Sequence, residues 1–194
     1  MARRREFDED ALLERSTSLF WEKGYTATSM SDVAAVSGVG NGSIYAAYGS
    51  KPELFLLVFE RYCAGRVDMV RRAMAEGAAA QEAVASFFEA VIDDCASHQP
   101  SWGCLMLNTL AEVGRDWPEV VEVAQKAIAE MERLVDARLA LEGVAGDGRA
   151  LLAAEIVLVS QGLIQFSRIE QEPQRLRDIA SSALEHLTPA LRAA

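Results

Sequence analysis

Apolar residues recur at helical spacing along almost the whole of this 194-residue chain. No stretch shows the strict alternation of polar and apolar residues that marks a half-buried β-strand, and no internal repeat is present. The pattern therefore predicts an all-α protein of about nine helices, packed as two parts without a flexible linker. We expect helices at residues 7–23, 30–37, 41–48, 51–76, 79–97, 103–113, 117–142, 148–170 and 173–192, separated by short breaks that contain Gly or Pro.

The net charge of −10 does not by itself indicate nucleic-acid binding, but the charge is unevenly distributed. Residues 1–51 hold six Lys/Arg and seven Asp/Glu, whereas residues 52–194 hold 13 and 22. Three cysteines with no CxxC pair predict free thiols in a reducing cytosol. We expect a cytoplasmic protein, because neither a signal peptide nor a membrane-spanning segment is evident.

The segment "SGVGNGSIYAAYGSK", residues 37–51, carries little bulk between two apolar, helix-patterned stretches. Before it, Ser29 and Asp32 form an S-x-x-D capping box that starts a helix, which Gly38 should end after about two turns. Two short helices joined by a tight turn that contains Gly describe a helix-turn-helix, here at about residues 29–48. The second helix of such a motif lies in the major groove of DNA.

The leading end of that second helix has the residues that groove entry requires. Gly42 permits close approach of the backbone, while Asn41 and Ser43 can form hydrogen bonds to base edges. Tyr45 and Tyr48 carry hydroxyl groups suited to phosphate oxygens. Ile44 should point into a small core, and Lys51 lies at the start of the next helix, where the helix dipole also favours an anion.

Residues 24–54, "GYTATSMSDVAAVSGVGNGSIYAAYGSKPEL", closely resemble the DNA-binding segment of the TetR/AcrR family of transcriptional regulators. The resemblance covers about residues 6–65. It implies an N-terminal three-helix DNA-binding domain, residues 1–52, packed on a larger effector-binding and dimerisation domain, residues 53–194. It also implies a repressor released from operator DNA by a small molecule. By position, the resemblance implies DNA contacts from Ser29, Ser31, Asn41, Gly42, Ser43, Tyr45 and Lys51.

Some positions depart from the family pattern. Gly40 replaces the usual Ser-like cap, and Ala46 and Ala47 are small, which weakens side-chain readout from the middle of the recognition helix. At the N-terminus, Arg4 and Arg5, with Arg3 before them, either reach the minor groove or a phosphate, or belong to a solvated terminus.

The last two expected helices suit a dimer. Residues 150–166 are apolar nearly all round, and the final helix carries a continuous apolar stripe. We expect these helices to pair with their copies in a second chain, as the family resemblance also implies; the alternative is that they complete the core of one chain. The expected interface residues are Ile156, Val159, Leu163, Ile179, Leu184 and Leu187.

The effector site is less constrained by the sequence. No catalytic residues, metal or cofactor is expected. Cys95, with His98 one helical turn away, and Cys104 allow metal or thiol sensing as alternatives to buried, inert cysteine. The candidate pocket residues, each of which could equally be ordinary core, are Phe87, Phe88, Val91, Trp102, Met106, Trp117 and Phe166.

The sequence thus predicts a homodimeric, ligand-responsive DNA-binding regulator whose partners are double-stranded operator DNA and an unidentified small molecule. Two alternatives stay open at this point. One is a helical-bundle enzyme, against which the chain offers only two histidines and no nucleophile elbow. The other is an interaction protein that keeps the fold without binding DNA.

Overall fold

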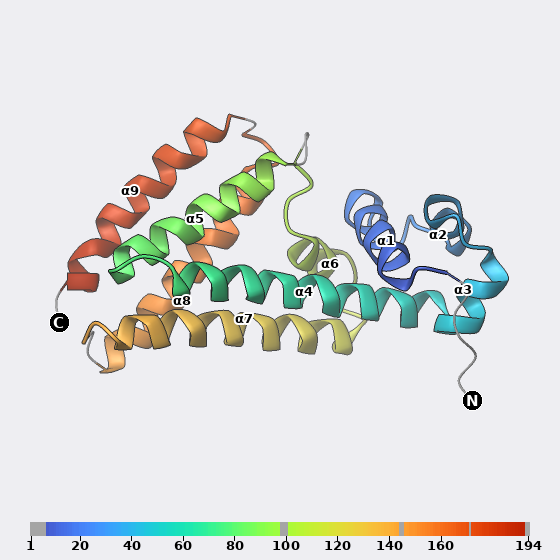
Figure 1. Ribbon diagram of the computed structural model, residues 1–194, viewed down its shortest axis with the longest axis horizontal. Coiled ribbons are helices and arrows are strands. Elements are labelled where there is room, and N and C mark those ends of the chain that lie inside the picture. Colours follow the sequence, from blue (N-terminus) through green and yellow to red (C-terminus); the bar gives the residue numbers. More distant parts are fainter. Residues whose placement is uncertain (1–6, 98–100, 144–145, 171, 193–194) are drawn as a thin grey trace. The chain divides into compact units, whose positions relative to one another are not determined.

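The computed structural model describes residues 7–97, 101–143, 146–170 and 172–192 (Figure 1). In this part of the chain every regular element is an α-helix, which confirms the predicted all-α class. The helices are α1 (Glu9–Lys23), α2 (Met30–Ser37), α3 (Asn41–Tyr48), α4 (Lys51–Ala75), α5 (Ala80–Ala96), α6 (Leu105–Val113), α7 (Pro118–Ala140), α8 (Gly146–Phe166) and α9 (Pro173–Arg192).

The expected helices all form, and most of their ends fall within two residues of the predicted positions. The clearest difference is the end of α8, which we expected at residue 170. The helix instead ends at Phe166, after which the N–H groups of Arg168 and Ile169 bond to carbonyls only three residues back. Such tight bonds close the last turn of a helix and end it.

The described residues form two compact units, and the three boundaries between them fall inside α4, directly before α6 and inside α7. The first unit runs to Cys63 and also contains Leu105–Ala124, and the second contains Ala64–Cys104 and the rest of the chain from Gln125. The predicted domain boundary after residue 52 stays a prediction, but this division shows that α6 belongs with the N-terminal helices.

In the first unit, α1 packs on α2 and α6, and α2 packs on α3. The start of α4 supplies the centre of its core, because Leu54, Phe55 and Phe59 are completely buried. The ring of Phe55 lies 4.8 Å from Phe20 and 5.6 Å from Trp117, between centroids. Large aromatic side chains bury much apolar surface, which suits a unit with three short helices.

In the second unit, α5 packs against both α8 and α9, which also contact each other (Figure 1). Buried apolar residues recur along α5 at helical spacing, among them Val84, Phe88 and Ile92. The segment Gly148–Phe166 of α8 is long and apolar enough to cross a membrane by length and composition alone. One such helix, with one side packed in the second unit, does not indicate a membrane protein.

Candidate nucleic-acid interface

A complete capping box fixes the start of α2, as the sequence predicts. The Asp32 backbone N–H donates to the Ser29 hydroxyl at 3.1 Å, and the Ser29 N–H donates to the Asp32 carboxylate at 2.8 Å. The hydrogen bonds from the Ser29 side chain and backbone lower the pKa of Asp32, and the charge of Lys23, 3.4 Å away, adds to the effect. The start of α2 therefore stays anionic and capped at neutral pH.

The end of α2 is equally well defined. Gly38 adopts a left-handed conformation with φ of 73°, which a side chain would make costly, and its N–H donates to Ala34. From α1, the Arg15 guanidinium donates to the carbonyls of Val36 and Ser37 at 3.2 and 3.3 Å. These contacts satisfy the exposed carbonyls at the end of the helix and set the turn that leads to α3.

The first turn of α3 presents a slim, polar surface. Asn41, Gly42 and Ser43 are exposed, whereas Ile44 is completely buried and anchors the helix, as the sequence predicts. The Asn41 amide donates to the exposed Ser31 hydroxyl at 3.4 Å, so the two predicted DNA contacts on α2 and α3 lie side by side. Gly40 supplies no side-chain cap. This turn can therefore approach a nucleic acid closely.

The two tyrosines of α3 do not share a role. Tyr45 is half exposed, with 50% of its surface accessible, as a phosphate contact requires. Tyr48 is only 8% exposed, and its hydroxyl donates to the carboxylate of Glu9 on α1 at 3.3 Å. The structure therefore corrects the prediction for Tyr48, because Tyr48 lies one helical turn after the buried Ile44 and so shares the inner face of α3.

Lys51, at the start of α4, stands over an aromatic ring. Its Nζ lies 4.2 Å from the centroid of Tyr25, in the loop between α1 and α2. Burial lowers the pKa of Lys51, and the nearby carboxylates of Glu112 and Asp32 oppose that effect. The ammonium group thus lies against the Tyr25 ring, with the carboxylates of Glu112 and Asp32 nearby.

Glu112, on α6, is the residue of this region that sequence reasoning missed. Its two carboxylate oxygens accept the backbone N–H groups of Tyr25 at 2.9 Å and of Thr26 at 2.7 Å. The partners are 87 and 86 residues away in the sequence, so no local spacing signals the contact. Burial alone would raise the pKa of Glu112, but the hydrogen bonds from Thr26 and Tyr25 and the charge of Lys51 lower it.

The predicted arm residues Arg4 and Arg5, with Arg3, lie outside the described residues, as does His98. Within the described ranges, no group of three or more His, Cys, Asp or Glu side chains could hold a metal ion.

The predicted pocket residues do not gather in one unit. Met106 and Trp117 belong to the first unit, where the Trp117 ring lies 5.0 Å from Tyr25. In the second unit, Phe87, Phe88 and Val91 are each 2% exposed. Trp102 is half-buried and Phe166 is exposed. Trp117 belongs to the aromatic core around Tyr25 and Phe55, and an effector-binding role for the predicted pocket residues stays a prediction.

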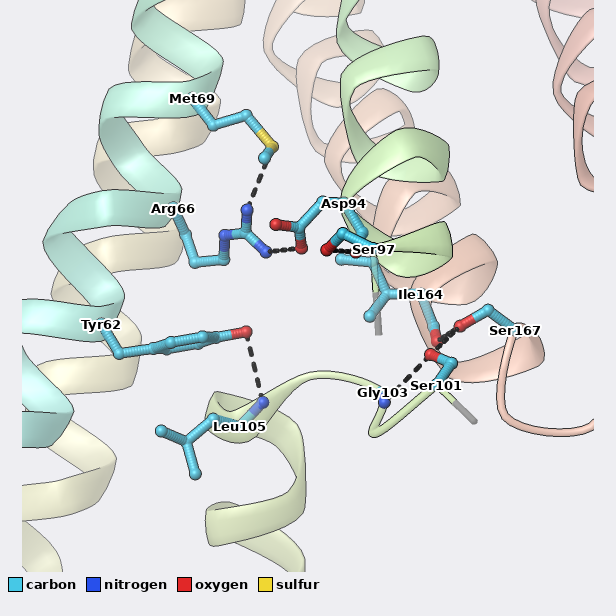
Figure 2. A network of polar contacts seen from close by, with 10 residues as sticks. All are labelled: Tyr62, Arg66, Met69, Asp94, Ser97, Ser101, Gly103, Leu105, Ile164 and Ser167. Carbon is cyan, nitrogen blue, oxygen red and sulfur yellow. Dashed lines mark hydrogen bonds and ion pairs between the residues drawn. The ribbon is translucent and has the colours of Figure 1, made fainter. Parts of the chain in front are cut away.

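A small hollow in the second unit lies between α5, α9, Ser101 and the segment that follows Phe166. It has about 190 Å³ including its open mouth, which is below the roughly 300–1,000 Å³ of ordinary ligand pockets. Its lining includes Cys95, Ser101 and Ser167, and the Ser101 and Ser167 hydroxyls are 2.7 Å apart (Figure 2). Ser167 donates to the Ile164 carbonyl at 2.7 Å.

The three described cysteines are buried as free thiols. Burial raises the pKa of Cys95, although a hydrogen bond with Ser167 opposes that rise. Nearby, Arg66 on α4 and Asp94 on α5 form an ion pair at 2.6 Å (Figure 2). A raised pKa disfavours the thiolate, the reactive form of cysteine.

The predicted dimer residues divide into buried and accessible ones. Ile156 and Leu163 are 0% and 3% exposed, so they complete the core of the second unit instead of meeting a partner. Val159, Ile179, Leu184 and Leu187 are half-buried. The exposed apolar residues of α8 are Leu151, Leu158 and Phe166, at 63%, 71% and 39%. The structure therefore corrects Ile156 and Leu163 and shows a different apolar face on α8.

A capped α2, a left-handed glycine turn and a slim, exposed α3 define a helix-turn-helix unit of the kind found in DNA-binding regulators. Two family models match the chain: "Bacterial regulatory proteins, tetR family" over residues 12–58, and "Transcriptional regulator LmrA/YxaF-like, C-terminal domain" over residues 80–182. The chain belongs to the TetR family of transcriptional regulators and is a DNA-binding regulator, not an enzyme.

Individual relatives agree. The HTH-type transcriptional repressor ComR of Escherichia coli K12 is 27% identical over 185 residues, covering 92% of this chain and 88% of the relative. A solved structure of the TetR family regulator CifR, a cysteine mutant complexed with 26-base-pair operator DNA, is 27% identical with a TM-score of 0.79, covering 94% and 98% of the two chains. SCO4454 of Streptomyces coelicolor, at 20% identity and a TM-score of 0.80 over 94% and 89%, shares the fold.

Proposed function

We propose that this chain is a cytoplasmic, homodimeric repressor that binds operator DNA through α3 and leaves it when a small-molecule effector binds. Support for repression comes from ComR, which is described as a transcriptional repressor, and support for operator binding comes from the CifR complex with operator DNA. Both relatives match over most of their length and over most of this chain.

The observation that carries the proposal is the division of α3 into two faces. Asn41, Gly42 and Ser43 are exposed at its leading end, while Ile44 and Tyr48 hold its other face in the core. A helix so anchored can present amide and hydroxyl groups to base edges without rearrangement. Tyr45, which is half exposed, and Lys51, at the start of α4, are the proposed phosphate contacts farther along the chain.

A dimer is proposed because operators of helix-turn-helix proteins have half-sites about 34 Å apart, which two copies of α3 must match. The exposed apolar side chains Leu151, Leu158 and Phe166 recur at two-turn intervals and so lie along one side of α8. This face, with the half-buried Leu184 and Leu187 of α9, is the proposed contact with a second copy. Self-complementary apolar faces of this kind suit a two-fold interface.

Effector release requires a ligand that binds the DNA-free conformation more tightly than the DNA-bound one. The second unit is the proposed location, because most of residues 80–182, which the LmrA/YxaF-like C-terminal model matches, lie in it. The hollow beside Cys95 is too small for an effector of drug size, so binding there would require the cavity to enlarge.

The direct test is a gel-shift assay with DNA taken from beside the gene that encodes this chain, over a salt series. We expect sequence-preferring binding with a steep decrease in affinity as salt rises, because bound phosphates release counterions. Binding equally to an unrelated fragment, or no binding at low salt, would contradict operator recognition.

A further inference from the structure

We propose that Glu112 is a positioning residue for operator binding, whose carboxylate holds the loop between α1 and α2 in the shape that DNA recognition needs. The inference rests on the proposed operator binding and adds a residue from α6 to it. Glu112 has no place in the helix-turn-helix segment itself, and it is assigned no direct contact with DNA.

The contact uses both carboxylate oxygens. Oε1 accepts the N–H of Thr26 at 2.7 Å and Oε2 accepts the N–H of Tyr25 at 2.9 Å, and the Thr26 side chain also bonds to the carboxylate. Charge-assisted hydrogen bonds of this kind are about twice as strong as neutral ones. Two adjacent backbone donors on one carboxylate fix the orientation of the peptide units as well as their position.

The loop is shaped closely around this carboxylate. Gly24 ends α1 with φ of 84°, and a Cβ at that position would lie 2.9 Å from Oε2 of Glu112. The hydroxyl of Thr28, which is buried, donates back to the Gly24 carbonyl at 2.7 Å. The next residue is Ser29, the cap of α2, so the loop that Glu112 holds leads directly into the first helix of the DNA-binding motif.

The same carboxylate acts on the residue expected to hold phosphate. Tyr25, whose N–H it accepts, carries the ring on which Lys51 stands at 4.2 Å. Glu112 also attracts Lys51 electrostatically. Release of the loop would therefore move the ring under Lys51 and the start of α2 together.

Positioning and simple electrostatics predict opposite signs for the loss of Glu112. An acidic side chain near a phosphate-binding lysine repels DNA, so on charge alone its removal should strengthen binding. If Glu112 orders the loop, its removal should weaken binding, because DNA must then order the loop itself. Whether operator affinity falls or rises when Glu112 is removed therefore distinguishes loop positioning from electrostatic repulsion.

The experiment measures operator affinity over a salt series for the full-length protein and for Glu112→Ala, Glu112→Gln and Glu60→Ala. Glu60 is an exposed glutamate on α4 in the same unit, so its variant reports the effect of losing one negative charge. Hydrogen–deuterium exchange of a peptide covering residues 24–29 reports the loop directly. Melting temperatures show whether each variant is folded.

We expect Glu112→Ala to weaken operator binding about tenfold, the factor that corresponds to ordering about one backbone residue. Glu112→Gln keeps one acceptor oxygen, so its operator affinity should lie between that of Glu112→Ala and that of the wild type. The slope of affinity against salt should not change, because no phosphate contact is lost. Exchange in residues 24–29 should become faster in both variants and stay unchanged in Glu60→Ala.

Three results would overturn the inference: binding as tight as in Glu60→Ala, a reduced salt slope, or unchanged exchange in residues 24–29. If the wild type itself binds no operator, the proposed function fails and the inference fails with it. Normal wild-type binding with unaltered Glu112 variants removes only the role of Glu112.

Discussion

The Lys51 ammonium stands 4.2 Å from the centre of the Tyr25 ring, and the backbone of Tyr25 is in turn held by the Glu112 carboxylate. A lysine side chain in water samples many conformations, and ordering it on DNA costs free energy. Here the ring and two neighbouring carboxylates, those of Glu112 and Asp32, restrict it beforehand. The proposed phosphate-binding group is thus partly preorganised in the free protein.

Lys51→Met should weaken operator binding and reduce the slope of log affinity against log salt by about one, because one phosphate contact is lost. Methionine keeps an apolar stem over Tyr25, so the fold should survive. Gel shifts over a salt series measure both quantities. Lys126→Met on α7, in the second unit, is the control and should leave the slope unchanged.

Tyr45→Phe and Tyr48→Phe each remove one phenolic hydroxyl, from an exposed and from a buried tyrosine of α3. Tyr48→Phe should lower the free energy of unfolding by about 1 kcal/mol, because the buried hydroxyl loses its bond to Glu9, and should leave the affinity for DNA nearly unchanged. Tyr45→Phe should weaken DNA binding and leave the free energy of unfolding nearly unchanged. Denaturant unfolding and gel shifts on both variants check the pair; equal effects on DNA affinity would contradict the assignment.

Ser29→Ala removes the N-cap of α2. We expect a loss of about 1 kcal/mol in the free energy of unfolding, the usual effect of losing a serine cap. Ser29→Asn retains a capping oxygen without placing a second negative charge beside the Asp32 carboxylate, and it should recover most of the stability in chemical denaturation. A Ser29→Ala variant as stable as the wild type would show that the helix does not depend on this cap.

Asp32 should make stability depend on pH in the acid range. Its pKa is lowered in the folded protein by hydrogen bonds from Ser29, so the folded state holds that proton less tightly than the unfolded chain. The stabilisation is complete above the ordinary aspartate pKa of about 3.9 and is lost as pH falls through the lowered folded value. Asp32→Asn should therefore lower the melting temperature at neutral pH, by an amount that shrinks below about pH 4. Asp116→Asn, at an exposed aspartate in the same unit, controls for loss of charge.

Leu158→Asn should shift the protein from dimer toward monomer. Leu158 is 71% exposed in one chain. In a two-fold interface each substitution occurs twice, so two polar amides would be buried in the apolar contact. Analytical ultracentrifugation over a concentration series measures the change, and operator affinity should fall with it. Leu57→Asn, at an exposed leucine of α4, should leave the association unchanged. A dimer unaffected by Leu158→Asn would move the interface elsewhere.

Cys95 should react slowly with thiol reagents in the folded protein. It is 7% exposed, and burial raises its pKa, so little thiolate is present at neutral pH. Alkylation followed by mass spectrometry should be much slower for the native than for the urea-unfolded protein, and faster as the pH rises. Rapid native alkylation with loss of operator binding would favour the thiol-sensing alternative.

The helices and the face of α3 could be predicted because their signals are local. The capping residues Ser29 and Asp32, the left-handed Gly38 and the apolar Ile44 each act within a few residues. The same local reasoning failed for Tyr48, because a tyrosine on a short helix suits either a phosphate or a core, and here burial beside Ile44 and the contact with Glu9 place it in the core. Because tyrosine has an apolar ring and a polar hydroxyl, the tertiary structure decides whether its side chain is buried or exposed.

The role of α6 and the face of α8 depend on contacts between distant segments. Glu112 meets Tyr25 and Thr26 across more than 80 residues, and no periodic pattern carries that information. On α8, which is apolar nearly all round, hydrophobicity cannot separate Ile156, which completes the core, from Leu158, which is exposed. For a uniformly apolar helix, the packing of its neighbours selects the outer side.

The contact between Glu112 and the loop at Tyr25 bears on how regulators of this kind can be recombined. A chimera that joins the first 52 or 63 residues of this chain to the body of another protein would carry the helix-turn-helix but leave behind the carboxylate that braces its loop. Such a hybrid should read DNA poorly unless the recipient offers an acceptor at the matching place, or unless Leu105–Ala124 is transplanted as well.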